Sequence, residues 1–309
     1  MKLLLFKKKF YNSLFGYILF LLIFPSILKA NIILKMQETN ARTAALGGGA
    51  ISFSNIISEN PASYSDIENN YLSVSNNNYL SDISLMSFKY AVKINKLNGS
   101  LFVGYTAFNS GKIRNTLITS SISYSDAGFT EIYENMFAIG YAHKFNNLSL
   151  GLNSKFINSD FAGVKDNSPA VDAGFRYDFK FLNDNFSAGG VIKNIGNSFK
   201  YDRDNYKIPL LYKFGLTSSS SNFLINNYFI KFGVECIYDN ENDFDAAAGC
   251  ELDYKHTIFL RTGYSTIQEQ GSGFNAGIGL NFNKFCFDYA WVPYSALGDA
   301  HYLSLSYTF

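Results

Sequence analysis

The chain has 309 residues, of which 47% are hydrophobic, 17% aromatic and 17% charged, and its mean hydropathy is −0.02. Tyr and Phe, with 22 and 30 copies, are over-used, whereas the charged fraction is below the quarter that is usual for a globular chain. This hydropathy excludes a bundle of membrane helices, and the nearly balanced charge offers nothing to a nucleic-acid partner. The composition suits an all-β transmembrane barrel, whose strands alternate apolar and polar residues.

Residues 1–30 have the three parts of a secretory signal peptide. Four lysines precede residue 10, an apolar run extends from Leu14 to Leu28, and Ala30 supplies the small residue before a cleavage site. A membrane-anchor helix is the alternative, but the run is short for a spanning helix and contains a proline. Because five of the 26 basic residues lie in this leader, cleavage leaves 21 basic and 25 acidic residues, a net charge of about −4.

Residues 31–70 do not alternate as a wall strand does. They contain Gly47, Gly48 and Gly49, whose backbone can pack closely against a neighbour, and Asn60-Pro61-Ala62, in which the proline ends any regular element. We interpret this segment as an N-terminal hatch, or plug, folded inside a barrel formed by residues 71–309. A tail in the periplasm is the alternative.

From residue 71 onward, segments of about ten residues alternate apolar and polar side chains between turns rich in Asn, Asp, Ser and Gly. Fifteen segments qualify, whereas single-chain bacterial barrels have even strand numbers, so the sequence predicts about 14 strands, with 71–77 the weakest candidate. The candidates are 71–77, 84–94, 98–107, 117–125, 134–145, 147–156, 169–179, 185–193, 207–217, 226–238, 244–254, 257–265, 273–282, 284–292 and 301–309.

The two faces of these segments differ in the way that a membrane wall requires. In 171–179 the even positions Asp172 and Arg176 face opposite to Val171 and Phe175, so the charges point to the lumen and the apolar residues to lipid. Glycines recur on the inward face, where they leave room for a plug or a passage, and the plug is the interpretation we favour. These glycines are Gly140, Gly151, Gly174, Gly189, Gly215, Gly233, Gly249, Gly263, Gly277 and Gly279.

The last candidate strand resembles the signal read by the outer-membrane barrel assembly machinery. Leu303, Leu305, Tyr307 and the terminal Phe309 share one face of an amphipathic strand. Aromatic residues also gather at strand ends, as suits a bilayer interface. With the leader, these features predict the bacterial outer membrane and contact with its lipid. A soluble sandwich is the alternative, because its strand ends are also aromatic.

Five apolar side chains face inward against the trend and form a candidate ligand pocket. They are Val191, Leu211, Phe229, Ile237 and Phe259. Four of the five lie on three nearby segments, as a mostly apolar pocket would require. The alternative is that they seat apolar side chains of the hatch.

No constellation for catalysis, metal binding or a cofactor is evident, so we expect a protein that is not an enzyme. The three His are scattered, and we interpret each as an interface residue rather than as part of a Ser-His-acid arrangement. The inward acidic row Asp245, Glu251 and Asp253 is expected to pair with basic lumen residues rather than to bind calcium. If Tyr238 pairs with Phe244, Cys236 and Cys250 lie on the order of 13 Å apart, too far for a disulfide.

Three stretches together resemble the PorV/PorQ-like family of outer-membrane proteins, which is related to the FadL-type transporter barrels. They are residues 41–50 with Asn60-Pro61-Ala62, then Asn194-Ile195-Gly196 with Ile208-Pro209-Leu210, and a closing hairpin from Phe285 to His301. The resemblance implies a fourteen-stranded barrel with an N-terminal hatch. The chain departs from the family where Ser63-Tyr64 follows the Asn-Pro-Ala motif.

The resemblance implies two functions. One is the transport or binding of a hydrophobic solute; the other is a role in type IX protein secretion, in which exported proteins dock at the outer membrane. A surface adhesin is a third reading, supported only by the polar loops near 108–116 and 194–206.

Overall fold

The computed structural model describes residues 40–309, apart from 54–58, 80–81, 121–122, 162, 182–183, 197–198, 202–203, 207, 221–227, 240–243, 268–270 and 296–297. The predicted signal peptide and the first nine residues of the predicted hatch, 31–39, lie outside the described residues. In the described part of the chain, no helix has both the length and the apolar character needed to span a bilayer.

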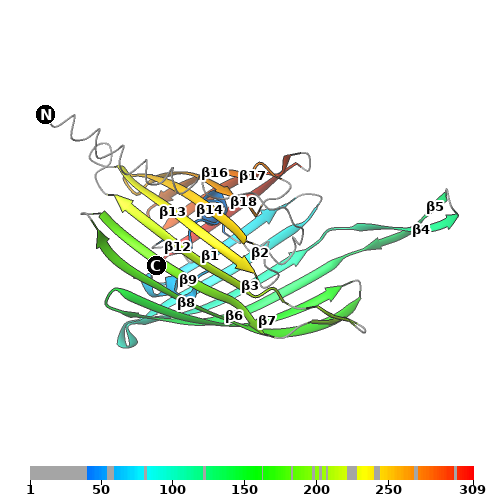
Figure 1. Ribbon diagram of the computed structural model, residues 1–309, viewed down its shortest axis with the longest axis horizontal. Helices are drawn as coiled ribbons and strands as arrows, with labels where there is room; N and C mark the ends of the chain where they lie inside the picture. Colours follow the sequence, from blue (N-terminus) through cyan, green and yellow to red (C-terminus); the bar gives the residue numbers. More distant parts are fainter. Residues whose placement is uncertain are drawn as a thin grey trace. The chain divides into compact units, whose positions relative to one another are not determined.

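Fourteen antiparallel strands close into a barrel, as the alternation predicts (Figure 1). Wall neighbours follow one another in chain order, and β18 pairs with β1 to close the ring. The wall strands are β1 (Tyr71–Asn78), β2 (Ser84–Ile94), β3 (Gly99–Asn109), β6 (Ile132–Phe145), β7 (Leu148–Phe161), β8 (Val164–Phe181), β9 (Asp184–Gly196), β12 (Leu211–Ser220), β13 (Tyr228–Asp239), β14 (Phe244–Tyr254), β15 (Ile258–Ser265), β16 (Phe274–Phe282), β17 (Phe285–Pro293) and β18 (Asp299–Thr308).

The surplus strand candidate is 117–125, not 71–77, so the sequence ranked the wrong segment as weakest. Residues 117–125 span the end of β4 (Ile113–Ser120) and the start of β5 (Ser123–Thr130), which pair only with each other among the described strands. Their flanking strands β3 and β6 pair directly, from Gly99 opposite His143 to Asn109 opposite Tyr133, and leave no place between them. Figure 1 shows β4 and β5 as a hairpin extending from the wall.

A second hairpin outside the wall joins β9 to β12. It consists of β10 (Phe199–Tyr201) and β11 (Asp204–Tyr206). The remaining elements are short helices: α2 (Ala41–Ala45), η1 (Pro61–Asp66) and η2 (Asn95–Leu97).

The two ends of the barrel differ in their connections. At the terminal rim, where β1 begins and β18 ends, the turns are short, as at 95–98, 146–147, 255–257 and 283–284. There the Phe309 N–H donates to the Asn70 carbonyl (3.0 Å). The opposite end, the loop rim, carries both extra hairpins. Short periplasmic turns and longer outer loops are typical of outer-membrane barrels, so we infer that the terminal rim faces the periplasm.

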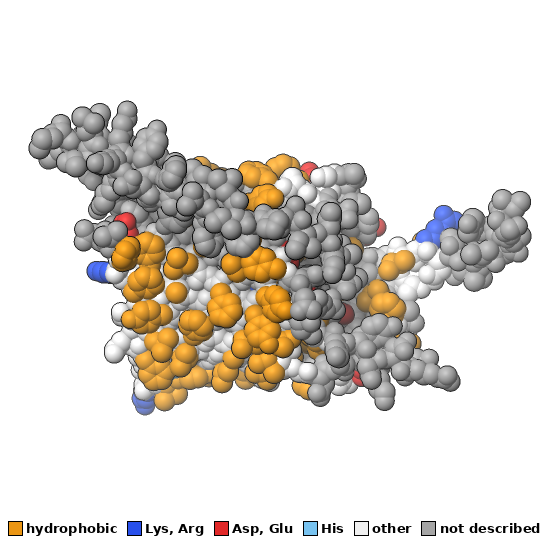
Figure 2. Space-filling view, in the orientation of Figure 1, with side chains coloured by type: hydrophobic (Ala, Val, Ile, Leu, Met, Phe, Trp, Pro, Cys, Tyr) orange, Lys and Arg blue, Asp and Glu red, His pale blue; other side chains and the backbone are white. Residues whose placement is uncertain are grey.

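Side chains alternate across the wall as the sequence predicts. In β8, Asp172 and Arg176 are buried toward the lumen while Val171 and Phe175 are exposed on the outside. The outward face carries a broad belt of hydrophobic side chains (Figure 2). Its members include Phe137, Leu152, Leu260, Leu280, Phe287 and Leu303. This belt gives lipid an apolar surface and keeps charge inside.

Candidate functional site

The N-terminal segment, comprising residues 40–53 and 59–70, packs on the inward face of the wall. The helix α2 contacts β15 to β18, and η1 contacts β3 and β6 to β8. Inward glycines make this approach possible. A Cβ on Gly249 would lie 2.7 Å from the Leu46 carbonyl oxygen, and a Cβ on Gly263 or Gly151 would overlap backbone atoms of the segment. Most of the predicted inward glycines therefore lie directly under the segment, whereas Gly140 and Gly279 face side chains of the wall itself.

The glycines of the segment itself have distinct reasons to be glycine. Gly47 and Gly48 have φ of +68° and +86°, a region that side chains disfavour. A Cβ on Gly49 would lie 2.9 Å from the Gly249 nitrogen. Two glycines thus turn the chain after α2, and the third allows it to touch the wall.

The Asn60-Pro61-Ala62 motif begins η1 and ties it to β8. The Asn60 side chain accepts from the Ala62 N–H (3.0 Å), capping η1, while its Nδ2 donates to the Phe175 carbonyl (3.0 Å) and to the Ile51 carbonyl (3.3 Å). Pro61 fits the first helical position because no N–H is required there. This buried asparagine therefore joins both halves of the segment to the wall.

One half of the segment is held by Arg42. Its guanidinium forms two 2.7 Å bonds with the carboxylate of Glu251 on β14, which also meets Arg261 Nε (2.8 Å) and Lys231 Nζ (3.4 Å). Arg261 continues the network to Asp288 (2.6 Å). Burial disfavours the Arg42 cation, but Glu251 outweighs it and raises the Arg42 pKa. The predicted pairing of the acidic row with lumen cations is confirmed for Glu251.

The other half is held by two acids. Glu59 Oε2 lies 2.7 Å from both Lys193 Nζ and Lys213 Nζ. Burial favours the neutral form of Glu59, but the two lysines outweigh it and hold the pKa of this carboxyl well below its usual range. Asp66 pairs with Arg176 and with Lys144 (3.2 Å). The segment therefore offers a cation to β14 and anions to β6, β8, β9 and β12.

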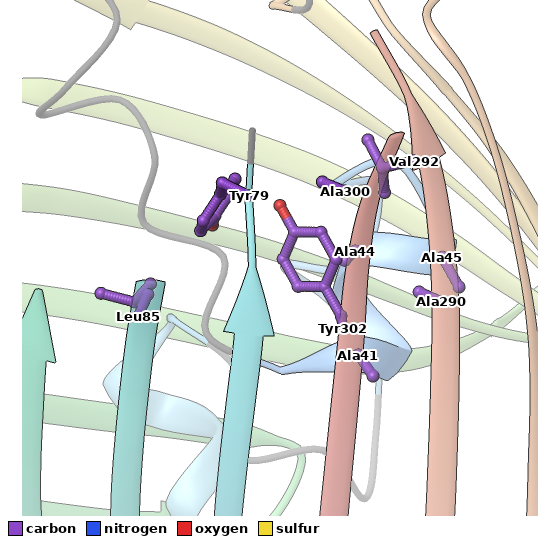
Figure 3. Close-up of a cluster of buried hydrophobic side chains, with 9 residues drawn as sticks. All are labelled: Ala41, Ala44, Ala45, Tyr79, Leu85, Ala290, Val292, Ala300 and Tyr302. Carbon is purple, nitrogen blue, oxygen red and sulfur yellow. The ribbon is translucent and has the colours of Figure 1, made fainter. Parts of the chain in front are cut away.

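An apolar cluster lies beside α2 on the inner side of the wall, toward the loop rim (Figure 3). It joins α2 to Tyr79, which directly follows β1, and to side chains of β2, β17 and β18. Tyr79 makes an edge-to-face contact with Tyr302 (5.3 Å between centroids). Its buried members are Ala41, Ala44, Ala45, Tyr79, Leu85, Ala290, Val292, Ala300 and Tyr302. Sequence reasoning missed this cluster, although Val292 and Tyr302 alternate with the exposed Trp291 and Leu303 and so could have been assigned inward.

The five predicted pocket residues face inward but do not form one pocket. Val191 and Ile237 both lie opposite Lys213, with Leu211 two residues away, near the loop rim. Phe229 and Phe259 both lie opposite Asp253, near the terminal rim. Eight residues of β13 separate Phe229 from Ile237, about 26 Å at the rise of a strand. The prediction of a single pocket was therefore wrong. It considered which strands are neighbours and not where along each strand the five residues lie.

The other predicted site residues lie as expected from alternation. Leu303, Leu305 and Phe309 are exposed on the outer face of the closing strand, with Tyr307 beside them. Cys236 lies opposite Ala246, and all three cysteines are free thiols. Among the described residues, no group of three His, Cys, Asp or Glu is placed to hold a metal ion.

The second resemblance motif is brought together at a bulge of β9. The register against β8 shifts between Val171 and Ala173, and Asn194 there has φ +65°. Asn194 Nδ2 donates to the Pro209 carbonyl (2.9 Å), and its backbone N–H donates to Asp172 (2.8 Å). A bulge of this kind bends a strand and redirects its side chains.

Comparisons with solved structures show the same architecture. The chain is similar to the Ralstonia pickettii toluene transporter TbuX (10% identity, TM-score 0.57), with 90% of this chain and 100% of that chain covered. It is also similar to a Pseudomonas aeruginosa FadL homologue (13%, 0.56; 88% and 98%) and to the P. putida toluene transporter TodX (10%, 0.57; 87% and 98%). No protein-family profile and no curated protein matches the sequence.

The barrel has the fold of the FadL-type outer-membrane transporters. At 10–13% identity the likeness concerns the fold. This fold and the apolar outer belt locate the protein in the bacterial outer membrane. The resemblance to the PorV/PorQ-like family stays a prediction.

Proposed function

We propose that this FadL-like barrel transports a hydrophobic solute across the outer membrane, with residues 31–70 as a hatch that closes the lumen. The observation that carries the proposal is the contact of α2 with the apolar cluster around Val292 and Tyr302. On this proposal, a solute that enters from the loop rim reaches the apolar cluster and then passes α2. A mostly apolar site with few polar groups is typical of pockets for such ligands. The role requires no catalysis or cofactor.

The fold supports the proposal without identifying the solute. Two of the similar structures are toluene transporters. The chain shares their architecture, and its own N-terminal segment is held against the inner wall by buried ion pairs. Buried ion pairs orient a segment more than they stabilise it, which suits a part that must leave and return to one position.

The test measures binding of a fluorescent hydrophobic probe to the purified protein in detergent. Wild type should bind, and Val292→Asp should abolish binding because it puts a charge into the apolar cluster. Phe229→Asp with Phe259→Asp, at the terminal rim, tests whether that end also contributes. Separately, deletion of residues 31–66 should leave an assembled barrel with higher single-channel conductance. An unchanged conductance would show that the segment is not a hatch.

A type IX secretion component of the PorV/PorQ type, which docks exported proteins, is the second candidate. The hairpin β4–β5 favours it, since its strands extend from the wall at the loop rim and expose Ile113 and Phe129. Two results would favour this function over transport. The wild type would bind no hydrophobic probe, and shortening of residues 112–131 would abolish protein export.

A further inference from the structure

The turn between β14 and β15 has residues that are unusual for its backbone conformation. Its central residues Lys255 and His256 have φ of +53° and +54°, and the Thr257 N–H donates to the Tyr254 carbonyl (3.0 Å). A two-residue turn with positive φ at both positions favours Asn-Gly, and larger side chains are strained there. A lysine and a histidine at these positions therefore point to a role for their side chains.

A second lysine lies in the next turn along the terminal rim. Lys284 follows Asn283 between β16 and β17. The two turns are joined through Asn281, whose N–H donates to the Thr257 carbonyl (2.8 Å) and whose Nδ2 donates to the His256 carbonyl (3.1 Å). The two turns are two strand spacings apart, which is about 10 Å. Two lysine side chains that extend from the two turns can therefore reach the same ligand between them.

The patch formed by Lys255, His256 and Lys284 is cationic and open to solvent. All three residues are exposed, and neither lysine takes part in an ion pair of the described residues. The adjacent acid, Asp253, is only 2% exposed and accepts from the His256 backbone N–H (2.7 Å) and bonds the ring Nδ1 (2.5 Å). The Asp253 carboxylate is thus buried on the inner side of the wall. The exposed charges of this part of the rim are the ammonium groups of Lys255 and Lys284.

Aromatic side chains lie on the lipid-facing side of the same patch. Lys255 Nζ lies 5.3 Å from the ring centroid of Tyr254, and Phe282 and Phe285 are exposed on the outer wall just below the second turn. Aromatic rings at a strand end mark the level of lipid head groups. A ligand held here would place its charge between the lysines and its apolar part along these rings.

From this placement we propose that Lys255 and Lys284 bind the phosphate of an anionic phospholipid in the leaflet at the terminal rim. A soluble phosphate would gain only the two ammonium groups, whereas a lipid also covers Phe282 and Phe285. The site is separate from the lumen and does not depend on the proposed transport.

The test titrates phosphatidylglycerol or phosphatidylcholine into the full-length protein in detergent and counts bound lipid by native mass spectrometry. Wild type should prefer phosphatidylglycerol, and salt should weaken that preference. Lys255→Gln with Lys284→Gln should lower its affinity about thirty-fold, since each lysine near an anionic surface contributes a factor of about five. The matched control is Lys112→Gln with Lys165→Gln, which removes two exposed lysines near the loop rim.

Three results would overturn the proposal, and the first two concern the lipid titration. One is a wild type that binds both lipids equally; the other is a control variant that loses phosphatidylglycerol as strongly as the rim variant. Far-UV circular dichroism of all variants should show the same β spectrum, so that a loss of binding reports on the site. Competition by free glycerol phosphate at equal concentration would also count against a lipid site.

Discussion

Arg42 and Glu251 form a bidentate ion pair, with two 2.7 Å bonds, between the N-terminal segment and the wall of the barrel. The two residues are 209 positions apart in sequence, so the pair exists only when the segment is seated. Glu251 keeps Arg261 and Lys231 as partners when Arg42 leaves. The wall therefore tolerates loss of this contact better than loss of Glu251.

Arg42→Met should loosen the segment without harming the barrel. Removing a charged hydrogen-bonding group of this kind costs about 2 kcal/mol, and Glu251 remains compensated by the wall. Single-channel conductance should rise while the yield of assembled barrel stays at the wild-type level. Glu251→Gln is the contrasting variant: it leaves three cations with too little negative charge and should lower the yield itself. Equal yields for the two variants would contradict this account.

Substitution of the wall glycines should displace the segment by steric overlap. Gly249→Ala with Gly263→Ala puts methyl groups where Leu46 and Gly47 backbone atoms lie. We expect higher conductance from an intact barrel, measured in planar bilayers. Gly104→Ala is the control, because its methyl group would meet the Phe102 ring at 2.8 Å rather than the segment. Conductance that rises equally in the control would show a general effect on the wall.

Glu59 predicts how the segment responds to acid. Lys193 and Lys213 lower its pKa on folding, against the effect of burial. A group with a lowered folded pKa stabilises the seated state fully above the ordinary carboxyl pKa and loses that contribution as pH falls below it. Wild-type conductance should therefore stay low at mildly acidic pH and rise only in stronger acid. Glu59→Gln should be leaky throughout this range; a wild type that opens already near neutral pH would refute the assignment.

The closing strand predicts a defect in assembly. We propose that the barrel assembly machinery recognises Leu303, Leu305, Tyr307 and Phe309. Phe309→Asp should reduce the heat-modifiable, folded barrel in outer-membrane fractions several-fold, because it charges the terminal residue of the strand that closes on β1. Leu97→Asp places the same charge on an exposed leucine of another terminal-rim turn and should assemble normally.

The sequence by itself determined the barrel, the strand number and the two faces of the wall. Period-two alternation is local, so Asp172 and Val171 can be assigned to opposite faces without knowing any partner strand. The inward position of the glycines could be predicted in the same way. A glycine at a lumen position has no side chain, so it allows another part of the chain to pack closely against it. The pairing of Cys236 with Ala246 also followed, because a short turn sets the register of its own hairpin.

Only the tertiary structure decided what depends on contacts between distant residues. Alternation in 117–125 looks the same in a wall strand and in a free hairpin, and the direct pairing of β3 with β6 excluded the former. The separation of Phe229 from Ile237, by contrast, could have been predicted from the sequence, because eight residues on one strand span about 26 Å. The apolar cluster could not be predicted, because it depends on the contact of α2 with β17 and β18, which lie more than two hundred residues after α2 in the sequence. Local periodicity specifies which way a side chain points, whereas register and closure specify what it meets.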